Sequence, residues 1–211
     1  MKNNQRQTKF VILVAMFMSI QLVMFLIPFL GFIPIGAVRI TTLHIPTILA
    51  GILLGVKGGS LVGVSFGAIS ALNATLNPNL TSFLFTPFAP ALSGYSGNVL
   101  SLVIAFVPRI LLGVTASLIY RFIKDKGLKF GAATITGVLA TILHTFMVLG
   151  LIFVIFANPY ASALDLDGAR GVLVFLGGII ATNGIFEAVL AGVLMTAFVT
   201  ALEPTVKKMV N

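Results

Sequence analysis

From Gly58 to Pro108 the chain carries no charged residue. Across all 211 residues, 58% are hydrophobic and only 9% are charged, with a mean hydropathy of +1.13. These values lie far outside the range of soluble globular proteins. Several apolar runs also reach the roughly twenty residues that a helix needs to cross the hydrocarbon core of a bilayer. The sequence therefore predicts an all-α integral membrane protein.

Short polar segments divide the apolar sequence into six predicted transmembrane helices. They cover about residues 10–30, 43–56, 59–76, 99–122, 130–157 and 172–202. An uncharged loop rich in Pro, Ser, Thr and Asn joins the third and fourth helices, from Asn77 to Asn98. The first run resembles a signal peptide, but its length and its lack of a small-x-small cleavage site favour a retained helix. We expect a single six-helix membrane domain over residues 1–211.

Basic residues are unevenly distributed over the predicted loops. If the N-terminus is cytoplasmic, the basic residues on the cytoplasmic side are Lys2, Arg6, Lys9, Lys57, Arg121, Lys124, Lys126, Lys129, Lys207 and Lys208. Only Arg39 and Arg170 then lie outside, and Arg109 lies within a span. This asymmetry fits the positive-inside rule and predicts that both termini are cytoplasmic. The net charge of +8 therefore reflects membrane orientation and does not indicate nucleic-acid binding.

The residue that most constrains function is Arg109, near the middle of the predicted span 99–122. A guanidinium stays protonated at any ordinary pH. Placing one at the centre of a bilayer helix costs roughly 2.5–3.5 kcal/mol even on lenient scales. Two interpretations remain open at this stage. Arg109 pairs with an internal carboxylate such as Glu187 and locks two helices together, or it binds an anionic substrate.

Three other polar residues lie at membrane depths similar to that of Arg109. They are His144 in the fifth predicted span and Asn183 and Glu187 in the sixth. Asn183 and Glu187 share one helix face because residues four apart align. Ionisable groups within a membrane usually face the interior and mark substrate paths. We expect Arg109, His144, Asn183 and Glu187 to line one cavity between the last three helices. The structural alternative is that Glu187 neutralises Arg109 and His144 bonds a backbone carbonyl.

Two asparagines near the outer end of the third predicted span are candidates for the mouth of this cavity. Asn73 lies within the span, and Asn79 belongs to the Asn77-Pro78-Asn79 sequence that follows it. Asn and Pro are also the residues that favour turns, so a purely structural turn is the alternative. We include both asparagines among the candidate substrate-binding residues.

Small residues recur at helical spacing in two of the predicted spans. Gly59, Gly63, Gly67 and Ala71 lie four residues apart, which lets another backbone approach closely. Ala15 and Ser19 form one small-xxx-small pair in the first span. Packing within the chain and docking of another subunit both explain such pairs.

Catalytic motifs are weak. Gly63-Val64-Ser65-Phe66-Gly67 matches the nucleophile-elbow string, but it lies in an apolar helix rather than a strand-to-helix turn. Gly94-Tyr95-Ser96-Gly97 is similar to the serine motif of rhomboid intramembrane proteases, and His144 would have to act as its base. The chain has no cysteine for a thiolate nucleophile or metal site, and no P-loop for ATP. We expect a protein that is not an enzyme and holds no metal or cofactor.

The sequence resembles the substrate-binding S components of energy-coupling factor (ECF) vitamin transporters. Its most specific stretch runs from Leu43 to Gly59, where Ile45-Pro46 leads to a Leu-Gly-x-Lys-x-Gly turn. Asn77-Pro78-Asn79 and Phe106-Val107-Pro108-Arg109 are similar to pantothenate-type members. The resemblance covers nearly the whole chain.

The resemblance implies a multi-pass protein of a bacterial cell membrane. It would capture a vitamin outside, dock on a transmembrane T component with two ATPase subunits, and topple to present the vitamin inside. Residues 31–42 and 77–98 would form the outer lid. S components dock through an Ala-xxx-Ala face on the first helix, which Ala15 matches and Ser19 does not.

Composition favours pantothenate as the substrate. The chain has no Trp and three Tyr, whereas flavin and pterin rings are usually held by large aromatic faces. An aliphatic, hydroxylated amide with a carboxylate needs a cation and a few hydrogen-bonding groups instead. Riboflavin and folate remain alternative substrates. A small secondary transporter, which would need an inverted repeat, and a rhomboid-like protease remain alternative classes.

Overall fold

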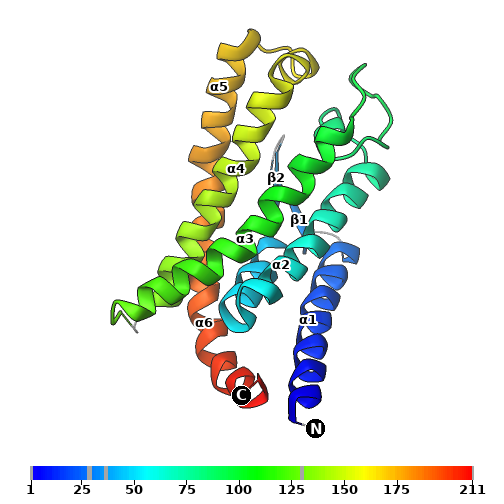
Figure 1. The fold of residues 1–211 in the computed structure, drawn as a ribbon. Coiled ribbons are helices and arrows are strands. Elements are labelled where there is room, and N and C mark those ends of the chain that lie inside the picture. The colour runs from blue at the N-terminus through cyan, green and yellow to red at the C-terminus, as the bar shows by residue number, and fades with distance from the viewer. Residues whose placement is uncertain (1, 28–29, 36–37, 129–130, 211) are drawn as a thin grey trace.

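The computed structural model describes all residues except 1, 28–29, 36–37, 129–130 and 211. Its elements form an elongated helical bundle in which the start of α1 and the end of α6 lie at the same end (Figure 1). In chain order they are α1 (Lys2–Leu26), β1 (Phe32–Ile35), β2 (Val38–Thr41), α2 (His44–Leu76), the 3-10 turn η1 (Ser82–Leu84), α3 (Val99–Asp125), α4 (Ala132–Ala163), α5 (Gly168–Ile179), the π-helical turn η2 (Ile180–Gly184) and α6 (Ile185–Val210).

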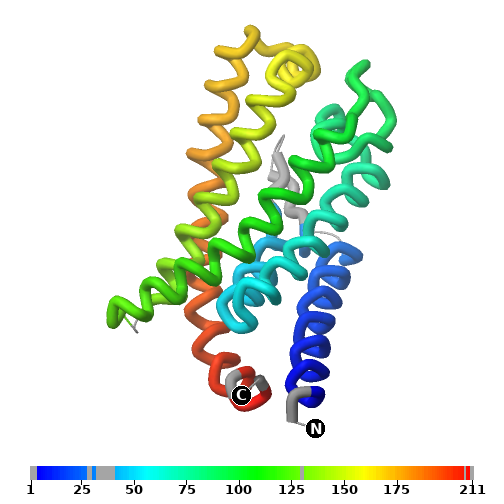
Figure 2. The backbone as a smooth tube through the Cα atoms, in the orientation of Figure 1, coloured from blue at the N-terminus to red at the C-terminus, as the bar shows by residue number. Residues whose placement is uncertain are grey.

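Five helical stretches among the described residues are long and apolar enough to cross a membrane, which confirms the all-α membrane class. They are Asn4–Leu26, His44–Leu76, Val99–Asp125, Ala132–Ala163 and Gly168–Val206. The last is one continuous rod made of α5, η2 and most of α6, lying beside α4 (Figure 2). Large apolar side chains face outward, with Val154 79% exposed and Val99 75% exposed. Such a surface suits lipid rather than water.

Helix α2 contains both the second and the third predicted spans. Its backbone leaves helical geometry at Gly55, where φ is 77° and ψ is −171°. Glycine adopts a positive φ without the steric cost that a Cβ would bring. The two limbs fold back on each other, since a Cβ on Gly59 would lie 2.8 Å from the Cα of Gly51. The predicted chain reversal between residues 56 and 59 is therefore correct to within a few residues.

Several predicted helix ends are wrong. Helix α1 ends at Leu26 rather than near residue 30, and α4 continues to Ala163 rather than ending near residue 157. The final helical stretch begins at Gly168 rather than near residue 172. Asn158 and Pro159 interrupt the apolar run but do not end the helix. In α4, the local departure from helical geometry at Phe156 accommodates Pro159.

Glycines allow α3 to cross both limbs of α2 at close range. A Cβ on Gly51 or on Gly59 would lie 2.5 or 2.6 Å from the Gly113 carbonyl oxygen of α3. Further along the same face, Gly63 packs against the Arg109 carbonyl and Gly67 against the Ala105 carbonyl. The predicted small-residue ridge is thus confirmed as a packing surface within the chain.

A short hairpin occupies the segment expected to be a loop between the first two spans. Strands β1 and β2 are antiparallel, with Phe32 opposite Thr41 and Ile35 opposite Val38. Four-residue strands give too few alternating positions to distinguish them from an apolar loop. The all-α prediction missed this hairpin, whose last residue lies at the cavity described below.

Most of the buried apolar side chains that the structure describes form two clusters. One includes Phe17 of α1, Phe66 of α2 and Met195 of α6. The other joins η1 to α3, α4 and α5 and includes Phe83, Phe156 and Leu176. Leu84, Val148 and Ile152 of the second cluster also form part of the wall of the main cavity, which this packing holds in place.

Candidate functional site

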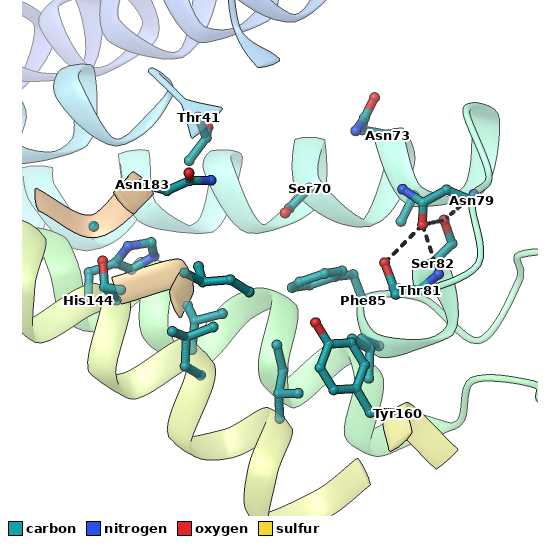
Figure 3. A pocket seen from close by; sticks show the side chains of 18 of the residues that line it. Thr41, Ser70, Asn73, Asn79, Thr81, Ser82, Phe85, His144, Tyr160 and Asn183 are labelled. Carbon is teal, nitrogen blue, oxygen red and sulfur yellow. Dashed lines mark hydrogen bonds between the residues drawn. The ribbon is translucent and has the colours of Figure 1, made fainter. Parts of the chain in front are cut away.

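A cavity of about 620 Å³ lies between α2, α3, α4 and the α5–α6 rod. All six side chains predicted to bind substrate line it: Asn73, Asn79, Arg109, His144, Asn183 and Glu187. The polar groups fall into two sets in Figure 3, with Thr41, His144 and Asn183 at one end and Asn73, Asn79, Thr81 and Ser82 at the other. Ser70 and Phe85 lie between these sets. The predicted convergence of the four membrane-depth residues is correct, and α2 contributes as well as the last three helices.

Arg109 is buried, with 6% of its surface exposed, and neutral groups hold its guanidinium. Nη1 donates to the Ile104 carbonyl oxygen at 2.6 Å, and Nη2 donates to the Ser70 hydroxyl at 3.2 Å. The guanidinium carbon also lies 5.4 Å from the centroid of the Phe66 ring and 5.2 Å from that of Phe85. Both distances lie within the range of a cation–π contact. These contacts fix the guanidinium without cancelling its charge.

The predicted alternative, an ion pair between Arg109 and Glu187, does not form. Among the described residues no carboxylate lies within ion-pair distance of Arg109, and its Nε has no hydrogen-bond partner. Burying an N–H without a hydrogen-bond partner costs the full free energy of removing it from water. The guanidinium therefore keeps its charge in the wall of the cavity, with no carboxylate of the described residues at ion-pair distance.

Two further residues of the cavity wall each have a buried side-chain nitrogen without a hydrogen-bond partner within the described part of the chain. These nitrogens are Nε2 of His144 and Nδ2 of Asn183. His144 lies on α4 with its ring 5.9 Å from that of Phe66, whereas Asn183 lies on the π-helical turn η2. The predicted bond from His144 to a backbone carbonyl is not seen at Nε2. Arg109, His144 and Asn183 come from three helical elements, α3, α4 and η2, and all three residues line the cavity.

Glu187 connects the cavity to the hairpin. Its Oε1 accepts a hydrogen bond of 2.8 Å from the backbone N–H of Thr41, the last residue of β2. Thr41 itself lines the cavity. A hydrogen bond to a charged acceptor contributes about 1.5–3 kcal/mol, more than one between neutral groups. Glu187 therefore fixes the end of the hairpin at the edge of the cavity.

The two predicted mouth residues take part in local turn structure. Asn79 Oδ1 accepts hydrogen bonds from the Thr81 backbone N–H at 2.9 Å and the Thr81 hydroxyl at 3.0 Å. Asn73 Oδ1 accepts from Asn77 Nδ2 at 3.1 Å. Both carbonyl oxygens therefore stabilise the turn, as the structural alternative predicted, although both residues also line the cavity.

Sequence reasoning missed several residues that shape the cavity. Ser70 contacts Arg109 directly, and Phe66 and Phe85 lie against its guanidinium. The two phenylalanines belong to apolar runs in which core or lipid contact is the default interpretation. Ser70 lies on α2 three residues before Asn73, so a search for polar residues on the Asn73 face could have found it.

The residues of the two alternative predictions lie elsewhere. Ser96 of the rhomboid-like motif is exposed in the loop before α3 and is not part of the cavity wall that contains His144. Ala15 and Ser19 are both exposed on α1. The Ser19 hydroxyl donates to the Ala15 carbonyl oxygen at 2.8 Å, so its hydrogen is already used within the helix. The face that these two residues share is thus small and free of an outward-directed donor.

Comparison with known proteins gives concordant matches. A family model described as ECF transporter, substrate-specific component, matches residues 9–199, which include every residue of the cavity. The chain is 37% identical over 165 residues to the pantothenic acid transporter PanT of Lactococcus lactis subsp. cremoris, with 78% of each chain covered. It is 29% identical over 219 residues to the pantothenate transporter PanT of Leuconostoc mesenteroides subsp. mesenteroides, covering 99% of this chain and 98% of the relative.

Proposed function

Because the chain belongs to the ECF transporter substrate-specific component family, we propose that it binds pantothenate in the cavity around Arg109. The observation that carries the proposal is a buried guanidinium with no carboxylate at ion-pair distance among the described residues, in a cavity whose wall also contains His144 and Asn183. The names of the two relatives support the same vitamin. Pantothenate carries one carboxylate, an amide and two hydroxyl groups, which suits one cation surrounded by neutral polar groups.

In this proposal the carboxylate of pantothenate binds Arg109. His144 Nε2 and Asn183 Nδ2 bond its amide and hydroxyl oxygens, and Glu187 accepts from a hydroxyl. Asn73 and Asn79 border the entrance. A guanidinium forms two parallel hydrogen bonds with a carboxylate, which gives orientation as well as affinity. The neutral anchoring of Arg109 supports this role, because no carboxylate of the described residues lies within ion-pair distance of it.

We further propose a bacterial cell membrane location with both termini cytoplasmic and six spans, the first limb of α2 counting as the second. The shared position of the start of α1 and the end of α6 in Figure 1 supports this orientation. So does the concentration of basic residues in the segments assigned to the cytoplasm. The entrance by Asn73 and Asn79 would then open to the outside.

The partners proposed for this subunit are a transmembrane T component and two ATPase subunits. Ala15 and Ser19 would contact the T component, where their small size allows close helix approach. The chain has no P-loop of its own, so nucleotide hydrolysis falls to the partner subunits. Residues 31–42 and 77–98 would close over the bound vitamin.

The experiment that tests this function is calorimetric titration of the purified chain, without ATP, against pantothenate, riboflavin and folate. We expect saturable binding of pantothenate and none of the two ring compounds. Uptake into liposomes should require the ECF partner subunits and ATP. Preferential binding of riboflavin or folate would contradict the substrate assignment, and gradient-driven accumulation by this chain alone would favour a secondary transporter.

A further inference from the structure

Arg109 follows a proline near the middle of a long helix, on its buried face. Pro108 lies inside α3, and both residues are buried. Proline has no backbone N–H, so it cannot donate the helical hydrogen bond to the carbonyl four residues earlier. That carbonyl belongs to Ile104, whose residue is completely buried. In a membrane helix such a carbonyl needs another donor, because an unpaired polar group in an apolar environment is costly.

The donor that satisfies it is Arg109. Its Nη1 lies 2.6 Å from the Ile104 carbonyl oxygen, which is the shorter of the two hydrogen bonds of the guanidinium. Because Pro108 has no N–H, the Ile104 carbonyl oxygen is free to accept a hydrogen bond from the side chain of Arg109, the next residue in the sequence. A carbonyl holds a guanidinium through its dipole and leaves the net charge in place. A carboxylate in the same position would have neutralised it.

The surrounding helices restrict alternatives to this arrangement. Gly63 packs directly on the Arg109 carbonyl, and a Cβ on Gly67 would lie 3.0 Å from the Ala105 carbonyl oxygen. The backbone of α3 is therefore held from the α2 side over the turn that contains Pro108. Phe66 and Phe85 flank the guanidinium and limit where it can swing. Nη1 could be released without altering a side chain of the cavity if the Ile104 carbonyl oxygen accepted a hydrogen bond from another donor.

We propose that Pro108 is a positioning residue for substrate: by freeing the Ile104 carbonyl, it anchors Nη1 of Arg109 and directs the rest of the guanidinium into the cavity. This inference rests on the proposed function in one respect, namely that the anion received there is the carboxylate of pantothenate. It assigns a role to a residue that does not line the cavity and would not touch the ligand.

The test is substitution of Pro108 by Ala, with Pro108→Gly as a second variant. Each supplies an N–H that can bond the Ile104 carbonyl, so the carbonyl is no longer reserved for Arg109. We expect pantothenate to bind about tenfold more weakly, the effect of losing one hydrogen bond to a charged group. Thermal stability should stay equal or rise in Pro108→Ala, because proline is the poorest residue for a helix interior.

Pro204→Ala provides a matched control. Pro204 also lies inside a helix, α6, but it is exposed and lies outside the wall of the cavity. Its substitution should leave the affinity for pantothenate unchanged. In an Arg109→Gln background, Pro108→Ala should cause no further loss of affinity, since the anchored group is gone. An equal loss with or without Arg109, or a parallel fall in stability and affinity, would overturn the inference.

A measurement without ligand separates failure of this inference from failure of the proposed function. In the unliganded protein, hindered guanidinium ¹⁵N–H signals that disappear in Arg109→Gln identify the Nη groups of Arg109. We expect these signals to be lost or averaged in Pro108→Ala. If the wild type did not bind pantothenate, the proposed function would fail, while this spectrum would still decide whether Pro108 anchors Arg109. Unchanged Arg109 signals in Pro108→Ala would overturn the inference.

Discussion

At the scale of single residues, the structure explains how a permanent charge persists inside an apolar bundle with no carboxylate of the described residues at ion-pair distance. Arg109 costs roughly 2.5–3.5 kcal/mol at the centre of a membrane helix. One hydrogen bond to a charged group contributes about 1.5–3 kcal/mol, and a cation–π contact about 0.5–2 kcal/mol. Two hydrogen bonds and two aromatic faces are therefore enough to offset the cost. Its charge remains for a ligand.

The first prediction distinguishes this arrangement from a structural ion pair. Arg109→Gln should weaken pantothenate binding about ten- to a hundredfold, the equivalent of about 1.5–3 kcal/mol, while the protein stays folded. Adding Glu187→Gln should not restore binding, because the two side chains form no ion pair. Calorimetry measures the affinity and thermal unfolding the stability. Recovery of both in the double variant would show that Arg109 and Glu187 are partners.

The second prediction concerns the backbone at Arg109. Gly63→Ala should lower stability by about 1–3 kcal/mol, because its Cβ would collide with the Arg109 carbonyl and overpack the contact between α2 and α3. Gly150→Ala in α4 is the control, since nothing lies within 4 Å of its added Cβ. There the better helix propensity of Ala should leave stability equal or slightly higher. Equal effects at both positions in thermal unfolding would argue against the tight contact.

At the scale of elements, the hairpin and α6 are joined at one point beside the cavity. Glu187 lies in the first turn of α6, directly after the π-helical turn that carries Asn183. Its bond to the Thr41 N–H holds the end of β2. π-helical turns inside α-helices are frequently found at functional sites. The last residue of the hairpin is thus held in the wall of the cavity.

The third prediction tests the hairpin as a lid. Glu187→Ala removes the acceptor of the Thr41 N–H and, in the proposed site, of a pantothenate hydroxyl, so bound pantothenate should dissociate at least about tenfold faster. Stopped-flow measurement of the dissociation rate provides the test. Glu203→Ala serves as the control, because Glu203 bonds Lys124 and Tyr120 instead and does not line the cavity. An unchanged dissociation rate in Glu187→Ala would argue against a lid held by this bond.

The fourth prediction concerns the exposed face of α1. Ala15→Trp or Ser19→Trp should prevent close helix approach and abolish assembly with the T component. Binding of pantothenate to the isolated subunit should persist. Val154→Trp, on an exposed position of α4, should leave assembly intact. Co-purification with the partner subunits measures the effect, and assembly that tolerates Trp at both α1 positions would place the docking face elsewhere.

At the scale of the whole molecule, the sequence predicted what depends on periodicity and left out what depends on particular contacts. A shared cavity could be predicted for four residues that lie at similar depths in apolar helices: Arg109, His144, Asn183 and Glu187. The chain reversal near Gly55 could be predicted from the glycines around it. The hairpin strands are too short for a detectable period. The anchoring of Arg109 by Ile104, Ser70 and two phenylalanines was not foreseen either, since it depends on side-chain packing between α2 and α3.

The measurement that tests the central claim most directly is a thermodynamic cycle between Arg109 and the carboxylate of the ligand. Wild type and Arg109→Gln are each titrated with pantothenate and with its amide analogue. If Arg109 binds the carboxylate, the amide should cost the wild type about ten- to a hundredfold in affinity and the variant far less. An equal loss in both proteins would contradict the account, because the carboxylate would then interact with some other group.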